Sequence, residues 1–382
     1  MKQLKIDQLS YWEKNEFFNN IDFVIIGSGI VGLSTAIELK TQFPNAKILI
    51  VERGYIPTGA STKNAGFACF GSVSELLYDL EKMSEKDVSQ LLEYRWEGLK
   101  FLRKRLGDKA IDYQQNGSYE LFTSSEKDKF EACKAKIPAL NNFVENTLGL
   151  KNCFQVLEDN HFRFKNISGM IYSPFEGQID TGKMMINLLR KAIELRINII
   201  NSIELKQWTD AGDSVKLETT IGEIKCKQLI ICTNGFTHLL LPHIEVKPAR
   251  AQVILTKPIK DLHIKGIFHY QEGYYYFRNI HDRVLFGGAR NLDFKGEETH
   301  EFGNTDIITS SLKNLLADVI LPDTAFEIEQ QWSGIMGVGA SKMPLINQHS
   351  NNVFYGVRLG GMGIAMGSKI GSELARLIKM KY

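Results

Sequence analysis

Three glycines and one acidic residue form the most specific chemical pattern in the chain. An apolar run at residues 23–26 leads into Gly27-x-Gly29-x-x-Gly32 and a helix predicted over 30–40, and a second apolar run at 47–51 ends in Glu52. In such a unit the first glycine allows the tight turn, the second lets a pyrophosphate approach the backbone, and the third lets the helix pack on the strand. The acid accepts hydrogen bonds from a ribose diol. This order predicts a βαβ unit that binds the adenosine end of a dinucleotide.

A second glycine-rich run, GGMGIAMG at residues 360–367, lies between a strand predicted over 353–357 and a last helix predicted over about 364–380. Only residues 368–382 follow it, so no second strand with a ribose-binding acid can follow, and an independent dinucleotide unit is excluded. The start of a helix stabilises negative charge, such as that on the pyrimidine edge of a reduced isoalloxazine. One complete dinucleotide motif with one terminal helix loop therefore indicates FAD held alone, without a nicotinamide site.

Composition and charge exclude several other classes of protein. A chain of 382 residues with 43% hydrophobic and 24% charged residues is typical of a soluble globular protein of two domains. The net charge of +2 gives no indication of nucleic-acid or membrane binding, and no apolar run reaches the ~18 residues of a membrane span. The N-terminus is too polar for a secretory signal. Five scattered cysteines without a CxxC pair predict free thiols, no metal site and a cytoplasmic location.

The predicted elements indicate an α/β fold, in which an FAD-binding Rossmann-like domain is joined to an α+β substrate domain built on an antiparallel sheet. Helices are predicted over about 85–106, 125–147 and 182–196, and a β-rich segment over about 249–290. Residues 1–20 are expected to form an N-terminal arm. The FAD-binding domain is expected from residues 21–84, 166–245 and 331–382, and the substrate domain from 85–165 and 246–330.

Short motifs at positions 20–380 add to this pattern. They are GSGIVG with Glu52, GASTKNAG at 59–66, QID at 178–180, IICTNG at 230–235, PARAQ at 248–252, the segment 274–288, WSG at 332–334, Pro344 and GMGI at 361–364. In order and spacing they resemble the D-amino-acid oxidase superfamily, in the branch of glycine oxidase, sarcosine oxidase and γ-glutamylputrescine oxidase. The resemblance implies an extended FAD, hydride transfer to flavin N5 from a C–H beside an amine, and an imine that hydrolyses.

The resemblance also assigns FAD contacts to individual residues. They are Gly27, Ser28, Gly29, Ile30, Val31, Gly32, Glu52, Arg53, Ala60, Ser61, Thr62, Lys63, Asn64, Ala65, Gly66, Thr233, Asn234, Gly235, Gly334, Arg358, Gly360, Gly361, Met362, Gly363 and Ile364. Lys63 and Asn64 would lie beneath the flavin ring, or alternatively in a solvated turn. Some relatives tether the flavin through a Cys or His. Here the 61–64 positions hold no His and Cys69 is the only nearby cysteine, so we expect a non-covalent flavin.

The usual anchors for a substrate carboxylate are missing. Glycine and D-amino-acid oxidases bind it through an Arg after the Trp/Gly pair, and by motif spacing that position is Met336. The lysine used by sarcosine oxidases corresponds to Ala365. A bidentate Arg–carboxylate contact contributes about 1.5–3 kcal/mol. The expected substrate is therefore an amine, an N-substituted amino acid held elsewhere or a larger amine conjugate, rather than a plain α-amino acid.

The segment 274–278, YYYFR, supplies the catalytic candidates Tyr275, Tyr276 and Arg278. Strand alternation puts Tyr276 and Arg278 on one face and Tyr275 on the other. The resemblance places Tyr275 near the family's substrate-contacting tyrosine, and a slip of one residue would give that role to Tyr276. The alternative is an aromatic cluster that only packs. Arg278 either replaces the missing carboxylate anchor or pairs with a surface acid.

The predicted function is that of an FAD-dependent amine or amino-acid oxidase or dehydrogenase acting on a small-molecule substrate. Three alternatives share the same cofactor pattern: a 2-hydroxy-acid dehydrogenase, a tRNA-modifying oxidase-like protein and a non-catalytic flavoprotein subunit. The near-neutral charge disfavours tRNA, because nucleic-acid binding draws on a basic surface. Monomeric and oligomeric forms are both compatible with the sequence.

Overall fold

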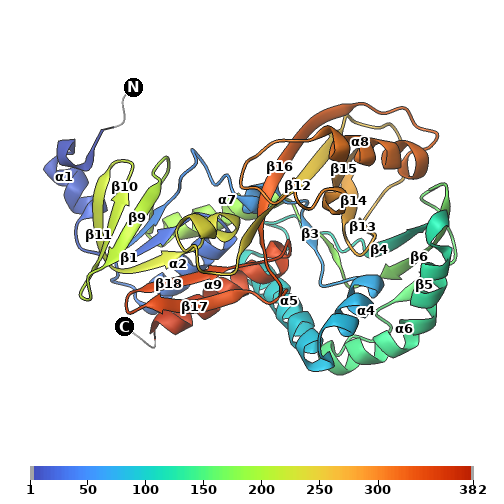
Figure 1. Ribbon diagram of the computed structural model, residues 1–382, viewed down its shortest axis with the longest axis horizontal. Coiled ribbons are helices and arrows are strands. Elements are labelled where there is room, and N and C mark those ends of the chain that lie inside the picture. Colours follow the sequence, from blue (N-terminus) through green and yellow to red (C-terminus); the bar gives the residue numbers. More distant parts are fainter. Residues whose placement is uncertain (1–3, 380–382) are drawn as a thin grey trace.

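Two β-sheets organise the molecule, one at the left and one at the right of Figure 1. The computed structural model describes residues 4–379. The first sheet is mainly parallel and the second is largely antiparallel, so the fold is mixed α/β, as predicted. Residues 1–3 of the expected N-terminal arm and the last residue of the predicted C-terminal helix lie outside the described part.

Five parallel strands form the centre of the first sheet, in the order β18-β11-β1-β2-β8. Strand β17 pairs antiparallel with β18, and a β9–β10 hairpin pairs with β11. Its strands are β1 (Ile21–Ile26), β2 (Ile48–Val51), β8 (Asn198–Ile200), β9 (Leu205–Asp210), β10 (Val215–Thr219), β11 (Gly222–Ile231), β17 (Leu345–Ser350) and β18 (Val353–Val357). Residues 23–26 of β1 and all of β2 are continuously apolar because both faces of these strands are buried.

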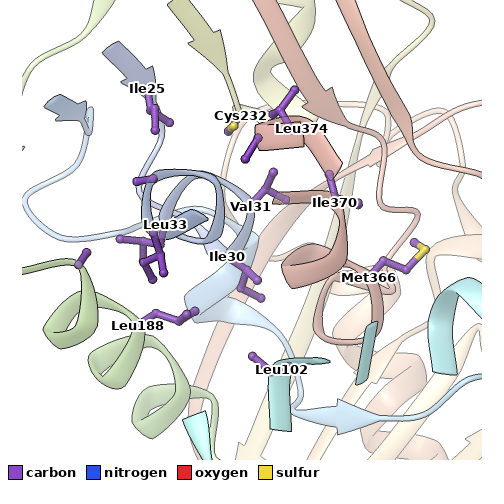
Figure 2. Packing of buried hydrophobic residues seen from close by; sticks show 14 of the residues in the cluster. Ile25, Ile30, Val31, Leu33, Leu102, Leu188, Cys232, Met366, Ile370 and Leu374 are labelled. Atoms are coloured by element: carbon purple, nitrogen blue, oxygen red, sulfur yellow. The ribbon is translucent and has the colours of Figure 1, made fainter. Parts of the chain in front are cut away.

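Helices α2 (Ile30–Gln42), α5 (Glu85–Leu106), α7 (Thr181–Glu194) and α9 (Gly363–Lys379) pack together against the first sheet. Figure 2 shows α2 and α9 side by side, with Val31, Ile370 and Leu374 at their contact. Glycines allow these helices to approach closely. A Cβ on Gly98 of α5 would lie 1.9 Å from the Ala365 carbonyl oxygen of α9. The position of α9 is therefore fixed by backbone contacts.

The second sheet has the order β16-β12-β15-β14-β13-β4-β6-β5, and all of its pairs are antiparallel except β13–β4. Helix α8 (Asp306–Leu315) packs on one face of this sheet. Helices α4 (Val73–Lys82) and α6 (Lys127–Leu148) cover one end of the opposite face. Its strands are β4 (Ser118–Thr123), β5 (Gln155–Leu157), β6 (Ile167–Ser173), β12 (Lys247–Thr256), β13 (Ile267–Tyr270), β14 (Tyr275–Ile280), β15 (Arg283–Gly288) and β16 (Ile328–Val338).

The pairing of strands β6 and β16 differs from the predicted domain boundaries. Residues 166–245 and 331–382 were assigned to the cofactor half, but β6 pairs with β4 and β16 pairs with β12 over most of its length. Both strands therefore belong to the second sheet. The reason is cross-strand pairing between segments far apart in sequence, which no local pattern encodes. The chain passes from the second sheet to the first through residues 339–344.

Short elements complete the structure. A two-stranded ribbon of β3 (Phe67–Ala68) and β7 (Gly177–Gln178) contacts both α9 and the residues of the second sheet. The short helix α3 (Ala60–Lys63) precedes it, and α1 (Tyr11–Glu13) lies in the N-terminal arm. Between residues 4 and 379, no helix combines the length and the apolar character that a membrane span needs.

Candidate functional site

The glycine turn after β1 has the geometry that a dinucleotide-binding turn requires. Gly27 has a φ of +99°, and a Cβ on Gly32 would lie 2.0 Å from the Gly27 carbonyl oxygen. A side chain at Gly32 would therefore push α2 away from β1. Gly29 precedes α2 without a capping side chain, and the Ile30 N–H donates to Ser61 Oγ at 3.0 Å. The start of α2 thus faces the loop that carries Ser61.

Glu52 follows β2, and its carboxylate lies beside this turn. Its Oε2 accepts hydrogen bonds from the Ser28 N–H at 3.0 Å and the Ser28 hydroxyl at 2.8 Å, and its Oε1 accepts from the Gly54 N–H at 2.8 Å. The side chain is buried, with 8% of the residue exposed. The neighbouring Arg53 guanidinium is directed toward the Phe236 ring, 4.2 Å from its centroid. The acid therefore sits where the adenosine-binding pattern requires it.

The loop at residues 59–66 crosses from α2 to the second sheet. Asn64 Oδ1 accepts hydrogen bonds from the Gly66 N–H at 2.9 Å and the Thr181 hydroxyl at 2.8 Å, which fixes the end of the loop. The Trp332 indole N–H of β16 donates to the Lys63 carbonyl oxygen at 2.9 Å. The Lys63 ammonium lies over the Phe302 ring, 5.0 Å from its centroid, so the side chain extends toward the loop that carries Phe302.

The terminal glycine loop is held by Asn234, which follows β11. Its Oδ1 accepts from the Arg358 N–H at 3.1 Å and the Leu359 N–H at 3.3 Å. The Arg358 side chain donates to the Met343 carbonyl oxygen at 3.0 Å. Arg358 therefore ties the terminal glycine loop to the segment before β17. Gly361 has a φ of +86°, and α9 begins two residues later.

These loops converge on one region. A Cβ on Gly367, in the second turn of α9, would lie 2.7 Å from Ile30 Cγ2 at the start of α2. A Cβ on Gly334 of β16 would lie 3.1 Å from Lys63 Cβ. Around Gly59 and Gly360, no described residue other than the glycine and its two chain neighbours has an atom within 4 Å of an added Cβ. Two adjacent helix starts, an acid at a strand end and open glycine loops form a cradle that fits an extended FAD.

The second sheet presents a row of register partners on the face that contacts this cradle. The row runs Trp332, Val253, Gly287, Tyr276, His269, Glu120 and Ile171 across seven strands. The Phe67 ring lies edge-on to the rings of His269 and Tyr276, at centroid distances of 5.3 and 5.8 Å. Burial raises the pKa of Tyr276 to about 12 and lowers that of His269 to about 4, so both side chains are neutral at pH 7.

Tyr275 lies on the opposite face of the sheet, so the structure does not place it on the cradle side, where the substrate-contacting tyrosine was predicted. Its hydroxyl lies 3.1 Å from Ser311 Oγ of α8, and its ring packs in the core beneath that helix. There it lines an open cavity of about 680 Å³, with Asp306 and Asp318 among the other lining residues. Alternation along β14 therefore leaves Tyr276 as the tyrosine on the cofactor side.

Arg278 lies on the same face as Tyr276, two residues along β14. A Cβ on Gly66 would lie 2.9 Å from one of its terminal nitrogens, so the guanidinium packs beneath the 59–66 loop. Only 6% of the residue is exposed, and Nε has no hydrogen-bond partner in the described chain. Burial lowers the pKa of Arg278 to about 10, and the charges of Asp180 and Asp112 oppose this effect. Arg278 is therefore a buried cation, not a surface ion pair.

A buried charge cluster that the sequence analysis did not predict lies at the other end of this face. Glu75 Oε1 accepts from Arg95 at 3.1 Å and Lys342 at 3.0 Å, and the Lys342 ammonium also lies 2.6 Å from Asp79 Oδ1. Burial would raise the pKa of Glu75, but the charges of Arg95 and Lys342 lower it to about 2. The only local signal was Ser-x-x-Glu at residues 72–75, which marks the start of α4.

The missing carboxylate anchors have structural explanations. Met336 Sδ would lie 3.2 Å from a Cβ on Gly361, so an apolar side chain occupies the position beside the terminal loop. Ala365 is 1% exposed and forms the close contact with Gly98 of α5, where a lysine side chain has no room. Neither position supplies a positive charge to this region.

Comparison with known proteins agrees with this geometry. A family model described as "FAD dependent oxidoreductase" (DAO) matches residues 22–377. The chain is 18% identical over 372 residues to the probable oxidoreductase OrdL of Haemophilus influenzae, covering 94% of this chain and 82% of that protein. It is 22% identical over 349 residues to the mitochondrial L-2-hydroxyglutarate dehydrogenase of Bos taurus, covering 82% and 71%. The solved glycine oxidase of Bacillus cereus has a TM-score of 0.71 at 20% identity, covering 95% and 96%, which shows the shared fold.

Proposed function

The chain belongs to the DAO family of FAD-dependent oxidoreductases, as its motifs predicted, and we propose that it oxidises a C–N bond of a small amine or N-substituted amino acid. The observation that carries this proposal is the pair of neutral polar side chains, Tyr276 and His269, on the sheet face toward the cofactor loops. Met336 and Ala365 stand where relatives carry a carboxylate anchor, which favours an amine over a plain α-amino acid.

The residues that would hold FAD follow from the cradle. The start of α2 would bind the pyrophosphate, Glu52 the ribose, and the loop at Gly361 with the start of α9 the pyrimidine edge of the ring. The chemistry supplied by bound FAD would be acceptance of a hydride from the carbon beside the nitrogen of a neutral amine; the resulting iminium would release its N–H proton to water, and the imine would be hydrolysed. The chain itself has to exclude water and orient the substrate, for which the partly buried Phe67 and Tyr276 and the buried His269 supply a wall.

We further propose that the flavin is not covalently tethered. Cys69 is the cysteine closest in sequence to the cofactor loop, and it is 3% exposed. Burial raises the pKa of the Cys69 thiol well above its ordinary value, and nearby carboxylates act in the same direction. Without thiolate character this side chain is a poor nucleophile for attachment. Denaturation of the yellow protein in acid should therefore release all of the flavin into the supernatant.

An anaerobic bleaching screen tests the proposed function. Purified holoprotein is mixed without oxygen with primary amines, N-methyl amino acids, D-amino acids and 2-hydroxy acids, and the visible flavin absorbance is followed. We expect at least one amine to bleach the flavin and release a carbonyl product. Protein that remains colourless when given FAD, or a flavin that no amine bleaches, would contradict the proposal.

A 2-hydroxy-acid dehydrogenase is the second candidate, because the chain also aligns with L-2-hydroxyglutarate dehydrogenase over 82% of its length. Such a substrate carries a carboxylate, for which the buried Arg278 is the available cation on this face. Bleaching by 2-hydroxyglutarate but by no amine would favour this function. In that case Arg278→Met should abolish bleaching, while an amine oxidase would tolerate the same substitution more readily.

A further inference from the structure

The row of register partners on the second sheet is anchored at two places. On one side the Trp332 indole N–H donates to the Lys63 carbonyl oxygen. On the other, Glu120 Oε1 accepts from the Ser72 hydroxyl at 3.0 Å, and its Oε2 accepts from the Ser74 N–H at 3.1 Å. The segment 63–74 therefore lies over the sheet with both of its ends fixed. Trp332 and Glu120, the outer polar side chains of the row, make the hydrogen bonds that fix these two ends.

Tyr276 and His269, between these anchors, have no such task. His269 is 7% exposed, and its Nε2 has no hydrogen-bond partner within residues 4–379. The Tyr276 ring lies over Gly287, where a Cβ would be 2.6 Å from Tyr276 Cε2 and 2.8 Å from its hydroxyl oxygen. A buried histidine that only fills space normally satisfies its ring nitrogens through neighbours. This one is left available to a ligand.

The protonation state of the His269 imidazole determines which ligand group can bind to it. Burial lowers the pKa of His269 to about 4 and keeps the imidazole neutral at pH 7, so one of its two ring nitrogens is a hydrogen-bond acceptor. An acceptor nitrogen without a partner is satisfied by a hydrogen-bond donor and not by a carboxylate, which is itself an acceptor. The face of the site at His269 is therefore suited to an N–H group.

We propose that His269 is a substrate-contacting residue whose Nε2 accepts a hydrogen bond from the N–H of the substrate amine. The proposal rests on the proposed function and deepens it, because it names the substrate class. The amine must retain at least one N–H in its neutral form, so primary and secondary amines are substrates and tertiary amines are poor ones.

A substrate comparison on the wild-type holoenzyme gives the first test without any substitution. An amine that bleaches the flavin is paired with its fully N-methylated tertiary analogue, and the Kd of each is measured from the concentration dependence of anaerobic bleaching. Loss of one buried hydrogen bond corresponds to about tenfold or more in Kd. Equal Kd values for the two amines would overturn the proposal.

Variants at His269 provide the second test. His269→Leu removes the acceptor and His269→Asn keeps a carbonyl acceptor of shorter reach, while His243→Asn changes an exposed histidine as a control. We expect His269→Leu to raise the Kd of the N–H amine by about tenfold to a hundredfold and to leave that of the tertiary amine unchanged. His269→Asn should recover part of the loss, and His243→Asn should match wild type.

The outcomes separate this inference from the function on which it rests. If no amine bleaches the wild-type flavin, the proposed function fails and this inference with it. If an amine bleaches wild type, and a His269 variant that binds one FAD per chain keeps the wild-type Kd, the function stands and the role of His269 is refuted. Should His269→Leu fail to bind FAD, His269→Asn and the wild-type amine comparison still decide the question.

Discussion

Tyr275 and Tyr276 are adjacent in the chain, yet they lie on opposite faces of the second sheet. Tyr276 packs with Phe67 toward the cofactor loops, and Tyr275 packs beneath α8. A strand alternates its faces at each residue, so a local pattern can pair Tyr276 with Arg278 but cannot tell which face meets the cofactor. That choice is made by the packing of whole elements, namely α8 on one side and β3 on the other.

The two tyrosines form a matched pair for mutation. Tyr276→Phe should lower kcat/KM for the bleaching amine by about tenfold, because the proposed function puts Tyr276 on the face that meets the substrate and the change removes its hydroxyl. Tyr275→Phe should leave the kinetics unchanged and lower the free energy of unfolding by about 1 kcal/mol, because it removes only the contact with Ser311. Steady-state kinetics and denaturant titration measure both effects. A loss of kcat/KM in Tyr275→Phe but not in Tyr276→Phe would show that Tyr275, not Tyr276, is on the face that meets the substrate.

Glu176 gives a pH dependence of stability. Its Oε1 accepts from the Phe70 and Gly71 N–H groups, Oε2 has no partner within the described residues, and burial raises its pKa to about 7 from an ordinary 4.5. The folded state therefore keeps a proton that the unfolded state releases between pH 4.5 and 7, so this group makes stability fall as pH rises through that window. The loss amounts to roughly 3 kcal/mol above pH 7.

The prediction is tested with Glu176→Gln, which carries no titrating proton. Relative to wild type, this variant should be more stable at pH 8 than at pH 5, as measured by denaturant unfolding at the two values. Glu194→Gln, on the exposed side of α7, is the control and should show no pH-dependent difference. A constant difference for Glu176→Gln across this range would contradict the raised pKa.

At the scale of elements, the sequence predicted what is encoded locally. The bounds of α5 were predicted as found because Ser84 caps its start and Gly107, with a φ of +83°, ends it. The glycine turn and Glu52 were likewise predicted, since all of their parts lie within one contiguous βαβ segment. His269 and Glu75 were missed, because the start of α4 meets β4 and its neighbour β13 only through the tertiary fold. Strands β6 and β16 were assigned to the wrong sheet for the same reason.

The contact between α5 and α9 makes a prediction at this scale. Alanine normally stabilises a helix relative to glycine, but at Gly98 its methyl group would meet the backbone of Ala365 at 1.9 Å. We expect Gly98→Ala to cost about 1–3 kcal/mol of stability and to weaken FAD binding, because α9 has to move. Glu93→Ala, at an exposed position of the same helix, should be neutral or slightly stabilising. If Gly98→Ala binds FAD with the wild-type Kd, the close contact between α5 and α9 is not needed for FAD binding.

At the scale of the whole molecule, the two sheets are joined where the cofactor cradle meets the polar row. The 59–74 segment runs from the start of α2 to the second sheet, and Lys342 ties the passage between β16 and β17 to Glu75 and Asp79 of α4. Both ends of the chain contribute to the same cradle, because α2 and α9 pack side by side (Figure 2). We therefore propose that one FAD binds with its nucleotide end at the start of α2 and its ring end at the start of α9.

Titration of the apoprotein with FAD and, separately, with FMN tests this central claim most directly. Flavin fluorescence and absorbance report the Kd and the stoichiometry for each. If the turn at Gly27, with Glu52, holds the adenosine end while the terminal loop holds the ring, one FAD binds per chain. FMN, which lacks the adenosine, then binds more weakly by about a hundredfold or more, the equivalent of about 2.7 kcal/mol. Equal affinity for FMN and FAD, or no binding of either, would contradict the account.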